Sequence, residues 1–454
     1  IDFQGMLPAA ITTDDYSLDP AVPDSIRGFP GVHANRNVEG YGSITVPGAV
    51  LGLARGLERF GRFGLDRVLE PAIRFAERGL PVDWFTVLMI ALGQPLLRKD
   101  PTAASVYLPN GVPPAPEQHL PLGRLADSLR AIAEEGSDVF YRGRLAESMA
   151  ADLQAGGSRI DEDDFAAYQA LEHDALSGEH RGVDLHTAGP TSGGPRLLDA
   201  FRHIAEHLEP GAGLDARSYK VYADALNAAW RAHRRRIGRE IPDGCTSHLS
   251  AVDAEGNMVA LTYTLLNRFG SGVVLPGTGI LMNNAVAYFD PRPGYPTTMA
   301  GRKRINASNM CPIVASRDGE AVFAIGASGA NHIMPCTTML AAFMLDHGLT
   351  LEEAYNTPRI DAPARGWGRG DPRLGYAALA HLGRHLELEV AQLLVFPKLF
   401  GCPSGVSRDP ESGLCSGISD PSLPIAGSAI AGDELPAIGQ DGPTAPQVDG
   451  RLRL

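Results

Sequence analysis

Hydrophobic residues in the first half of the chain recur at three- and four-residue intervals, the period of an amphipathic helix. This spacing predicts helices over residues 49–75, 123–135, 145–155, 162–168 and 218–236, with another that begins at residue 195. Strand-like runs lie at residues 180–185, through most of 246–325, and after residue 380; helical spacing returns over 337–346 and 351–357. Helices come first and strands second, without the alternation of a doubly wound fold. The pattern therefore predicts an α+β fold in which helices pack on an antiparallel sheet.

The most informative local pattern is a hairpin predicted within residues 245–265. Two strand-like runs, Leu249–Val252 and Met258–Leu265, flank a turn that contains Gly and Asn. Thr246 lies three residues before the first run and leads into it, and Thr264 lies near the end of the second. A hairpin start is a rigid place for a nucleophile whose base is its own α-amine, one of the known ways to activate threonine. The pattern therefore indicates a site where a precursor cuts itself and exposes a catalytic threonine.

Composition excludes several classes of function. The 454 residues carry a formal net charge of −13, which argues against nucleic-acid binding, because such binding needs a basic surface. No run of eighteen apolar residues occurs, so we expect no membrane span. The five cysteines have no regular spacing and contain no CxxC pair, so nothing in them indicates a zinc site. Isolated thiols are the simplest reading, although a bridge between Cys402 and Cys415 stays open.

The chain opens on Ile1 and has no signal-type segment, so we expect that it begins inside a longer gene product. Isolated thiols fit a reducing cytoplasm, which we favour as the compartment. A signal removed during export would instead place the protein in the periplasm or outside the cell, and the sequence leaves this choice open.

Motifs along most of the chain resemble those of the γ-glutamyltransferase family, a branch of the N-terminal-nucleophile hydrolases. The strongest is Thr-Ser-His-Leu-Ser-Ala-Val-Asp at residues 246–253, followed by Thr-Tyr-Thr at 262–264. Further matching motifs, in the same order as in the family, lie at residues 42–48, 69–73, 190–194, 269–272, 277–284, 308–312, 326–330 and 357–359. The resemblance implies the four-layer αββα sandwich of that fold, and it implies that no metal or organic cofactor is required. Ile1-Asp2-Phe3 resembles a point well inside the family's large subunit, so the family's opening portion is expected to be missing.

The resemblance implies self-cleavage between Cys245 and Thr246. Residues 1–245 would form a large chain and residues 246–454 a small catalytic chain, which stay together as a heterodimer and form one αββα domain. The freed Thr246 hydroxyl would attack a carbonyl carbon, and its α-amine would take the proton, because an α-amine has a pKa of about 7.7–8.0. Cys245 is a rival nucleophile, although Thr-Ser-His keeps the family's register. A dimer of heterodimers stays open.

Three further groups have roles implied by the resemblance. Thr264 matches the threonine that orients the nucleophile, whereas strand alternation alone cannot choose between Thr264 and Thr262. Gly329 and Ala330 occupy the paired-glycine position whose backbone N–H groups form an oxyanion hole. His248 follows the nucleophile by two residues, and we interpret it as structural because the α-amine already serves as base.

The substrate-binding positions depart from the family. Ser308 and Asn309 match a serine pair that contacts the donor's carboxylate, and Asn309 can still donate a hydrogen bond. Gln4 stands where the family has a carboxylate-binding arginine, a change that removes bidentate binding.

Two further departures affect the same region. Leu266 replaces an asparagine, and Ala285–Tyr288 replaces the polar residues that hold the donor's ammonium group. Arg268 is a candidate replacement cation; a solvated loop arginine is an equally good interpretation. Leu266, Ala285 and Tyr288 also suit a less polar acyl group.

We therefore predict an autoprocessed amidohydrolase or acylase that forms an acyl-enzyme on Thr246 and acts on a small-molecule amide or acyl substrate. Transfer of γ-glutamyl groups should be poor, and water should be the usual acceptor. One alternative keeps the fold but changes the bond: a β-lactam side-chain acylase, or a carbon–carbon hydrolase of secondary metabolism. An alternative of another class is an uncleaved, inactive homologue that acts as a binding protein.

Overall fold

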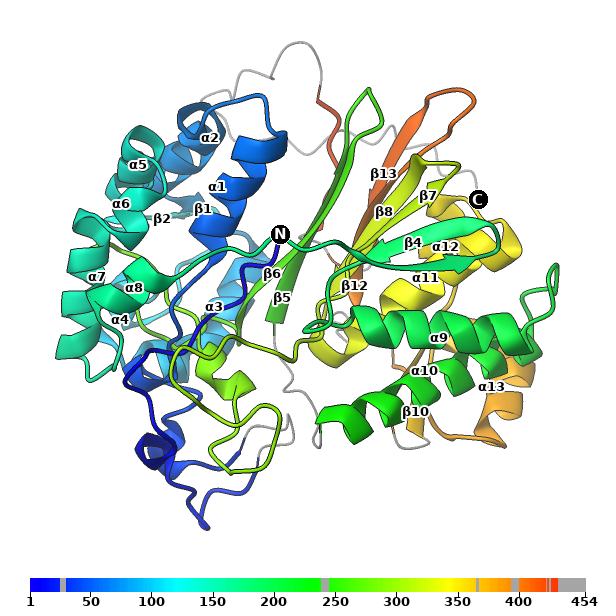
Figure 1. The fold of residues 1–454 in the computed structure, drawn as a ribbon, viewed down its shortest axis with the longest axis horizontal. Coiled ribbons are helices and arrows are strands. Elements are labelled where there is room, and N and C mark those ends of the chain that lie inside the picture. Colours follow the sequence, from blue (N-terminus) through cyan, green and yellow to red (C-terminus); the bar gives the residue numbers. More distant parts are fainter. Residues whose placement is uncertain are drawn as a thin grey trace.

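The computed structural model describes residues 1–24, 30–237, 245–364, 367–392, 400–421, 423 and 426–431. A helix-rich part formed by the first 170 residues lies on one side, and a sheet-rich part lies on the other (Figure 1). The hairpin predicted at residues 245–265 stands between them. The opening segment of the chain, which carries Gln4, and the hairpin, which carries Thr246 and Thr264, therefore lie close together near the middle of the molecule.

The helix-rich part contains the helices that the hydrophobic spacing predicted, with the run over residues 49–75 divided into α1 and α2. Its helices are α1 (Ala49–Phe60), α2 (Leu65–Arg78), α3 (Trp84–Leu97), α4 (Pro101–Tyr107), α5 (Leu125–Glu135), α6 (Asp138–Tyr141), α7 (Arg144–Ala155) and α8 (Glu162–Ala167), with the short pair β1 (Leu80–Pro81) and β2 (His119–Leu120). The spacing did not predict α3, α4 or α6. The sequence of α3, WFTVLMIALGQPLL, is apolar around most of its circumference. Asp83 nevertheless marks its start, since the carboxylate accepts a hydrogen bond from the Thr86 amide at 2.7 Å.

The main sheet has six antiparallel strands in the order β13-β12-β8-β7-β4-β3. These strands are β3 (Leu176–His180), β4 (Val183–Thr187), β7 (Ile313–Arg317), β8 (Glu320–Ser328), β12 (Cys402–Arg408) and β13 (Cys415–Ser419). The single strand predicted over residues 180–185 was wrong. Arg181 and Gly182 have positive φ and form a tight turn, so this stretch is the end of β3 and the start of β4. The strands expected after residue 380 do extend the sheet.

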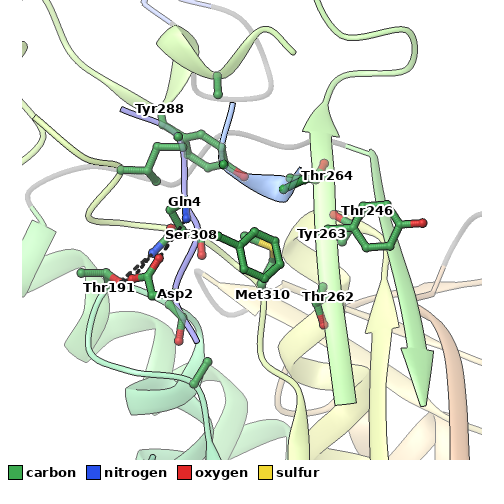
Figure 2. A pocket seen from close by; sticks show the side chains of 18 of the residues that line it. Asp2, Gln4, Thr191, Thr246, Thr262, Tyr263, Thr264, Tyr288, Ser308 and Met310 are labelled. Carbon is green, nitrogen blue, oxygen red and sulfur yellow. Dashed lines mark hydrogen bonds between the residues drawn. The ribbon is translucent and has the colours of Figure 1, made fainter. Parts of the chain in front are cut away.

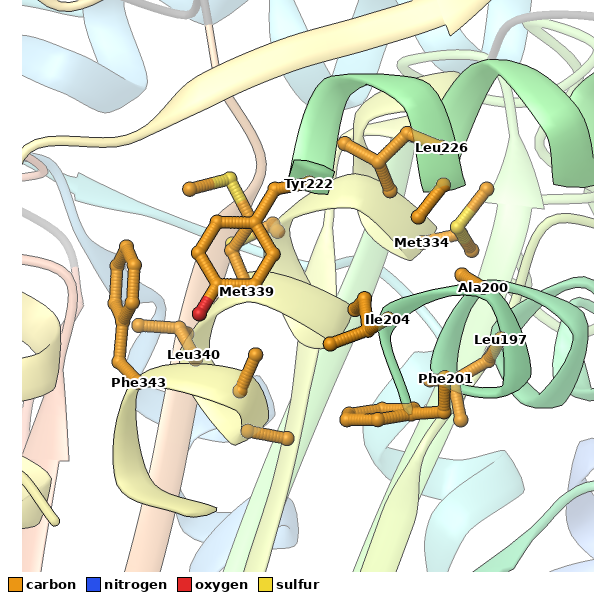
Figure 3. Close-up of a cluster of buried hydrophobic side chains, with 14 of the residues drawn as sticks. Leu197, Ala200, Phe201, Ile204, Tyr222, Leu226, Met334, Met339, Leu340 and Phe343 are labelled. Carbon is orange, nitrogen blue, oxygen red and sulfur yellow. The ribbon is translucent and has the colours of Figure 1, made fainter. Parts of the chain in front are cut away.

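Helices cover one face of the six-stranded sheet. They are α9 (Gly194–His207), α10 (Ala216–Ile237), α11 (Ile333–His347) and α12 (Leu351–Asn356). Side chains of α9, α10 and α11, among them Phe201, Tyr222 and Phe343, belong to one core (Figure 3). The same core contains inward-facing strand residues. Next to this core, β9 (Ile360–Ala364), β10 (Trp367–Gly370) and β11 (Glu387–Val390) form a small sheet beside α13 (Gly375–Gly383).

The predicted hairpin, formed by β5 (Cys245–Val252) and β6 (Met258–Leu266), lies on the opposite face of the six-stranded sheet. His248 contacts β8 so closely that a Cβ at Gly326 would lie 2.3 Å from its imidazole ring, so only glycine fits there. Helices α1–α8 lie beyond the hairpin (Figure 1). The order of layers is therefore helices, six-stranded sheet, hairpin, helices, which confirms the predicted αββα arrangement.

None of the five cysteines, all of which lie in the described part, forms a disulfide. Arg408 pairs with Cys415 across β12 and β13, whereas Cys402 begins β12 at its other end, so a bridge between Cys402 and Cys415 is excluded. Among the described residues, no helix has the length and apolar character needed to span a membrane.

Replacing Phe343 with alanine should lower the free energy of unfolding by about 3–5 kcal/mol, because it leaves a cavity between fully packed aromatic rings. Tyr219 and Tyr222 both contact the Phe343 ring edge to face, at centroid distances of 6.2 and 6.0 Å. The exposed Phe60 on α1 is the matched control, and Phe60→Ala should change stability by no more than about 0.5 kcal/mol. Urea unfolding followed by circular dichroism measures both; equal losses would contradict the assignment of this core.

Candidate functional site

A cavity of about 990 Å³ separates the hairpin from the opening segment of the chain. Its walls come from residues 1–5, 45, 47–49, 171, 173–175, 187–192, 245–247, 260–265, 267–269, 283, 285, 288, 304–306, 308, 310 and 312. Asp2, Gln4, Thr191, Ser308 and Tyr288 group on one side, and the threonines of the hairpin lie on the other (Figure 2). The site thus combines segments from before and after residue 245.

The expected cleavage point lies at an irregularity of the hairpin. Cys245 pairs with Leu266 and Ser247 with Tyr263, so the register shifts by one residue around Thr246. The Thr264 hydroxyl donates a short hydrogen bond to the Cys245 carbonyl oxygen, which belongs to the peptide bond between Cys245 and Thr246. The Leu266 amide donates to the same Thr264 oxygen at 2.8 Å. Because that amide occupies an acceptor position of the oxygen, the hydroxyl proton is directed at the carbonyl.

Leu266 has a backbone conformation that is unusual for its residue type. Its φ is +77°, in the left-handed region where a branched side chain is strained, and its side chain is buried. Asn284 supports this bend: its amide donates to the Leu265 carbonyl oxygen at 3.1 Å, and its Oδ1 accepts from the Asn267 amide at 3.0 Å. Asn284 therefore holds the chain where β6 ends and fixes the direction of the Leu266 amide.

His248 lies on the sheet-facing side of the hairpin. Its Nδ1 lies 2.7 Å from Thr262 Oγ1, and its Nε2 lies 2.9 Å from Ser250 Oγ. Burial lowers the pKa of His248 to about 4, so the imidazole is neutral near pH 7. These contacts fit the structural role that the sequence predicted, and they give Thr262 a partner other than Cys245.

A network of polar side chains forms the wall opposite the hairpin. The Gln4 side-chain amide donates to Thr191 Oγ1 at 2.7 Å and to Asp2 Oδ2 at 3.3 Å, and the Gln4 backbone amide donates to Asp2 Oδ1 at 2.9 Å. Arg304 forms an ion pair with Asp2, 3.6 Å from its Oδ1. Ser308 lies beside this group because its amide donates to the Thr191 carbonyl oxygen at 3.0 Å. Its hydroxyl is buried and has no hydrogen-bond partner.

Two other predicted substrate-binding residues line the cavity in different ways. Tyr288 is buried within the short turn Ala285–Tyr288, and burial raises the pKa of its phenol. Arg268 lies just beyond β6, and its Nε is buried without a hydrogen-bond partner. Both residues face the same cavity as Thr246, although they come from different loops.

Three predicted residues, Asn309, Gly329 and Ala330, are not among those that line the cavity. Gly329 and Ala330 have φ values of +123° and +55°, and they open the turn that leads into α11. Asn309 connects this turn to Ser308, because its Nδ2 donates to Asn331 Oδ1 at 2.8 Å. The role predicted for the Gly329 and Ala330 amides stays a prediction.

Sequence reasoning did not assign roles to Asp2, Thr191 or Arg304. Asp2 and Thr191 stand inside motifs that had been noticed for other reasons. Arg304 had no sequence signal, because it reaches the site only through the fold. Among the described residues, no group of three or more His, Cys, Asp or Glu side chains could hold a metal ion.

Comparisons with known proteins agree on one family. The family described as Gamma-glutamyltranspeptidase matches residues 1–239 and 214–424. The Acylase ACY 1 proenzyme of Pseudomonas sp. (strain SE83) is 31% identical over 401 residues, which cover 79% of this chain and 71% of that protein. The Glutathione hydrolase proenzyme of Escherichia coli (strain K12) is 29% identical over 414 residues, covering 79% and 70%. The crystal structure of cephalosporin acylase from Bacillus halodurans superposes with a TM-score of 0.79 at 22% identity, over 93% of this chain and 82% of that one.

The free energy of unfolding should fall by up to about 3 kcal/mol as the pH drops from 6.5 to 4, through His248. The folded-state pKa of His248, about 4, lies below its usual value of 6.5. The unfolded chain therefore binds the proton first, so this stability is fully present above pH 6.5 and lost on acidification. The buried His233, whose pKa burial lowers to about 2, acts in the same direction.

Urea unfolding at a series of pH values measures this dependence. His248→Gln should reduce the slope between pH 6.5 and 4, whereas His119→Gln, at an exposed position on β2, should keep it. An unchanged slope in His248→Gln would show that this imidazole does not titrate differently on folding.

Proposed function

Because the chain belongs to the gamma-glutamyltranspeptidase family, we propose that it is a self-processing acyl-amide hydrolase whose nucleophile is Thr246. The observation that carries this proposal is the hydrogen bond from the Thr264 hydroxyl to the Cys245 carbonyl oxygen. That oxygen is the atom on which negative charge would develop if the Thr246 hydroxyl attacked the preceding peptide bond.

Self-cleavage would follow from this geometry in two steps. The Thr246 oxygen attacks the Cys245 carbonyl carbon, and the peptide nitrogen takes a proton and leaves, which gives an ester between Cys245 and the Thr246 side chain. Water then hydrolyses the ester, releasing a Cys245 carboxylate, the Thr246 hydroxyl and a free Thr246 α-amine. The Thr264 hydroxyl stabilises the oxyanion of the first step, and the bulge around Thr246 supports this step because it interrupts the regular strand pairing.

Turnover would use the same threonine on an external amide. The Thr246 hydroxyl attacks the substrate's acyl carbon, its proton passes to the α-amine and then to the departing amine, and an acyl-enzyme forms. Water hydrolyses this ester and restores the hydroxyl. The Gly329 and Ala330 amides are our candidates for the oxyanion hole, because they open the turn before α11, where backbone N–H groups lack helical partners.

The active unit would be a heterodimer of residues 1–245 and 246–454. Gln4 and Thr191 come from the first chain, whereas Thr246, Thr264 and Ser308 come from the second, so neither chain alone completes the cavity. Helices α9 and α10 also pack with α11 in one core, which would hold the two chains together after cleavage.

The cavity supports an acylase that does not require a γ-glutamyl donor. The Gln4 side-chain amide already donates both of its hydrogen bonds, to Thr191 and Asp2, so it cannot replace a bidentate arginine. Tyr288 and Ala285 offer no carboxylate to an ammonium group. The relative named Acylase ACY 1 proenzyme supports this choice. Carbon–carbon bond hydrolysis is a second candidate, and release of amine from a panel of acyl anilides, with an initial burst, separates the two.

Thr246→Ala should abolish both self-cleavage and turnover, because it removes the attacking oxygen. Denaturing gel electrophoresis should then show one band near 48.2 kDa, whereas the parent shows two. Thr246→Ser keeps a hydroxyl and should still cleave. Cys245→Ala should also cleave, since the rival nucleophile is not needed. An uncleaved parent without a free Thr246 amino terminus would favour the binding-protein alternative.

Thr264→Val should slow self-cleavage by roughly 10²–10³-fold, the effect expected when one oxyanion donor is lost. Thr262→Val is the matched control, because it makes the same chemical change two residues away, where the hydroxyl contacts His248. Processing followed by gel densitometry measures both rates. If the two variants cleave equally fast, Thr264 has no special role in this step.

A further inference from the structure

A histidine–aspartate pair lies beside the turn that carries Gly329 and Ala330, and no step of the proposed reaction uses it. His332 ends this turn, and its Nδ1 forms a short hydrogen bond with Asp361 Oδ2. Asp361 lies on β9 and its side chain is 2% exposed, whereas the His332 side chain is 21% exposed. The second Asp361 oxygen, Oδ1, is buried and has no hydrogen-bond partner among the described residues. The buried carboxylate is therefore directed at the turn.

The backbone of this turn has a conformation that needs support. Gly329 and Ala330 have φ values of +123° and +55°, and the left-handed region is unfavourable for alanine because of its Cβ. Such a conformation persists only where the surrounding structure determines it. The His332 amide donates to the Gly329 carbonyl oxygen at 3.0 Å, which closes the turn but does not fix its place in the fold. Contacts from outside the turn must do that.

Three contacts hold the turn from outside. Asp361 connects it to β9, which packs against α10 and α11. Asn331 accepts from Asn309 Nδ2 at 2.8 Å, which joins the turn to the segment that forms the cavity wall opposite the hairpin. On a third side the chain passes so close that a Cβ at Gly401 would lie 2.7 Å from the His332 carbonyl oxygen. Because a hydrogen bond to a carboxylate is stronger than one between neutral groups, Asp361 provides the firmest of the two polar contacts.

We propose that Asp361 and His332 form a positioning pair for turnover: they hold the two amides of the neighbouring turn where the oxyanion of the acyl-transfer step develops. This inference rests on the proposed function, because it assigns a role within the same reaction. Neither side chain touches the substrate in this role, and neither exchanges a proton with it. The pair acts through the backbone of the turn, and its effect is on the transition state.

The pair should affect turnover and leave self-cleavage unchanged. In self-cleavage the negative charge develops on the Cys245 carbonyl oxygen, beside the Thr264 hydroxyl. In turnover it develops on the acyl oxygen of the substrate, for which the Gly329 and Ala330 amides are our candidate donors. A misplacement of about 1 Å can lower a rate by about 10²-fold. The two reactions of Thr246 therefore separate the role of this pair from a general effect on folding.

The test uses Asp361→Ala, with Asp346→Ala as the matched control. Asp346 forms a second buried histidine–aspartate pair, with His180 Nε2 at 2.9 Å, in the last turn of α11 and about 20 Å along that helix from the turn at its start. Asp361→Ala should cleave itself like the parent. Its kcat for an acyl anilide should fall about 10–100-fold while KM changes less than about twofold, because the lost effect belongs to the transition state.

Asp346→Ala should destabilise the fold at least as much, because it also loses an ion pair with Arg181, yet it should keep the parent's kcat. Thermal unfolding and acyl-anilide kinetics measure the two effects separately. His332→Asn should keep most of the parent's kcat, because the amide nitrogen of asparagine stands as many bonds from the backbone as Nδ1 of histidine and can still donate to Asp361.

Three results would overturn the inference: a cleaved Asp361→Ala variant with the parent's kcat, an equal loss of kcat in folded Asp346→Ala, or a joint loss of self-cleavage and turnover in folded Asp361→Ala. If Asp361→Ala does not fold, His332→Ala breaks the same pair from its more exposed side. A loss of kcat in that variant supports the inference, and an unchanged kcat overturns it. A parent that neither cleaves itself nor hydrolyses an acyl anilide would instead remove the proposed function.

Discussion

The hydrogen bond from the Thr264 hydroxyl to the Cys245 carbonyl oxygen fixes the two hairpin strands relative to each other next to Thr246. Its direction depends on the Leu266 amide, which occupies the Thr264 oxygen from the other side. That amide is presented by a leucine at positive φ, a strained conformation that persists only where neighbouring contacts determine it. Asn284 provides such contacts from a loop that follows the hairpin. The direction of this hydroxyl therefore depends on both strands of the hairpin and on the loop that carries Asn284.

The packing of the hairpin against the six-stranded sheet also depends on particular residues. His248 fits against Gly326, where any side chain would collide with the imidazole, and its two nitrogens contact hydroxyl groups on the hairpin itself. Because burial keeps this ring neutral, it fills the space between the hairpin and the six-stranded sheet without adding a charge near Thr246. A neutral, buried imidazole leaves the role of base to another group, and an α-amine at Thr246, as we propose it to be freed by self-cleavage, would have a suitable pKa.

The sequence predicted those parts of the fold whose signal is local. The hairpin was recognised because two alternating runs flank a Gly/Asn turn, and α1, α5 and α7 because their apolar residues keep a helical period. Helix α3 lacked that signal because it is apolar on most sides, and the turn at Arg181 was hidden inside a continuous strand-like run. Arg304 could not be predicted as a site residue, since only the fold brings it to Asp2. The motif positions identified Gly329 and Ala330 but could not show that neither lines the cavity, which depends on how the turn before α11 is placed in the fold.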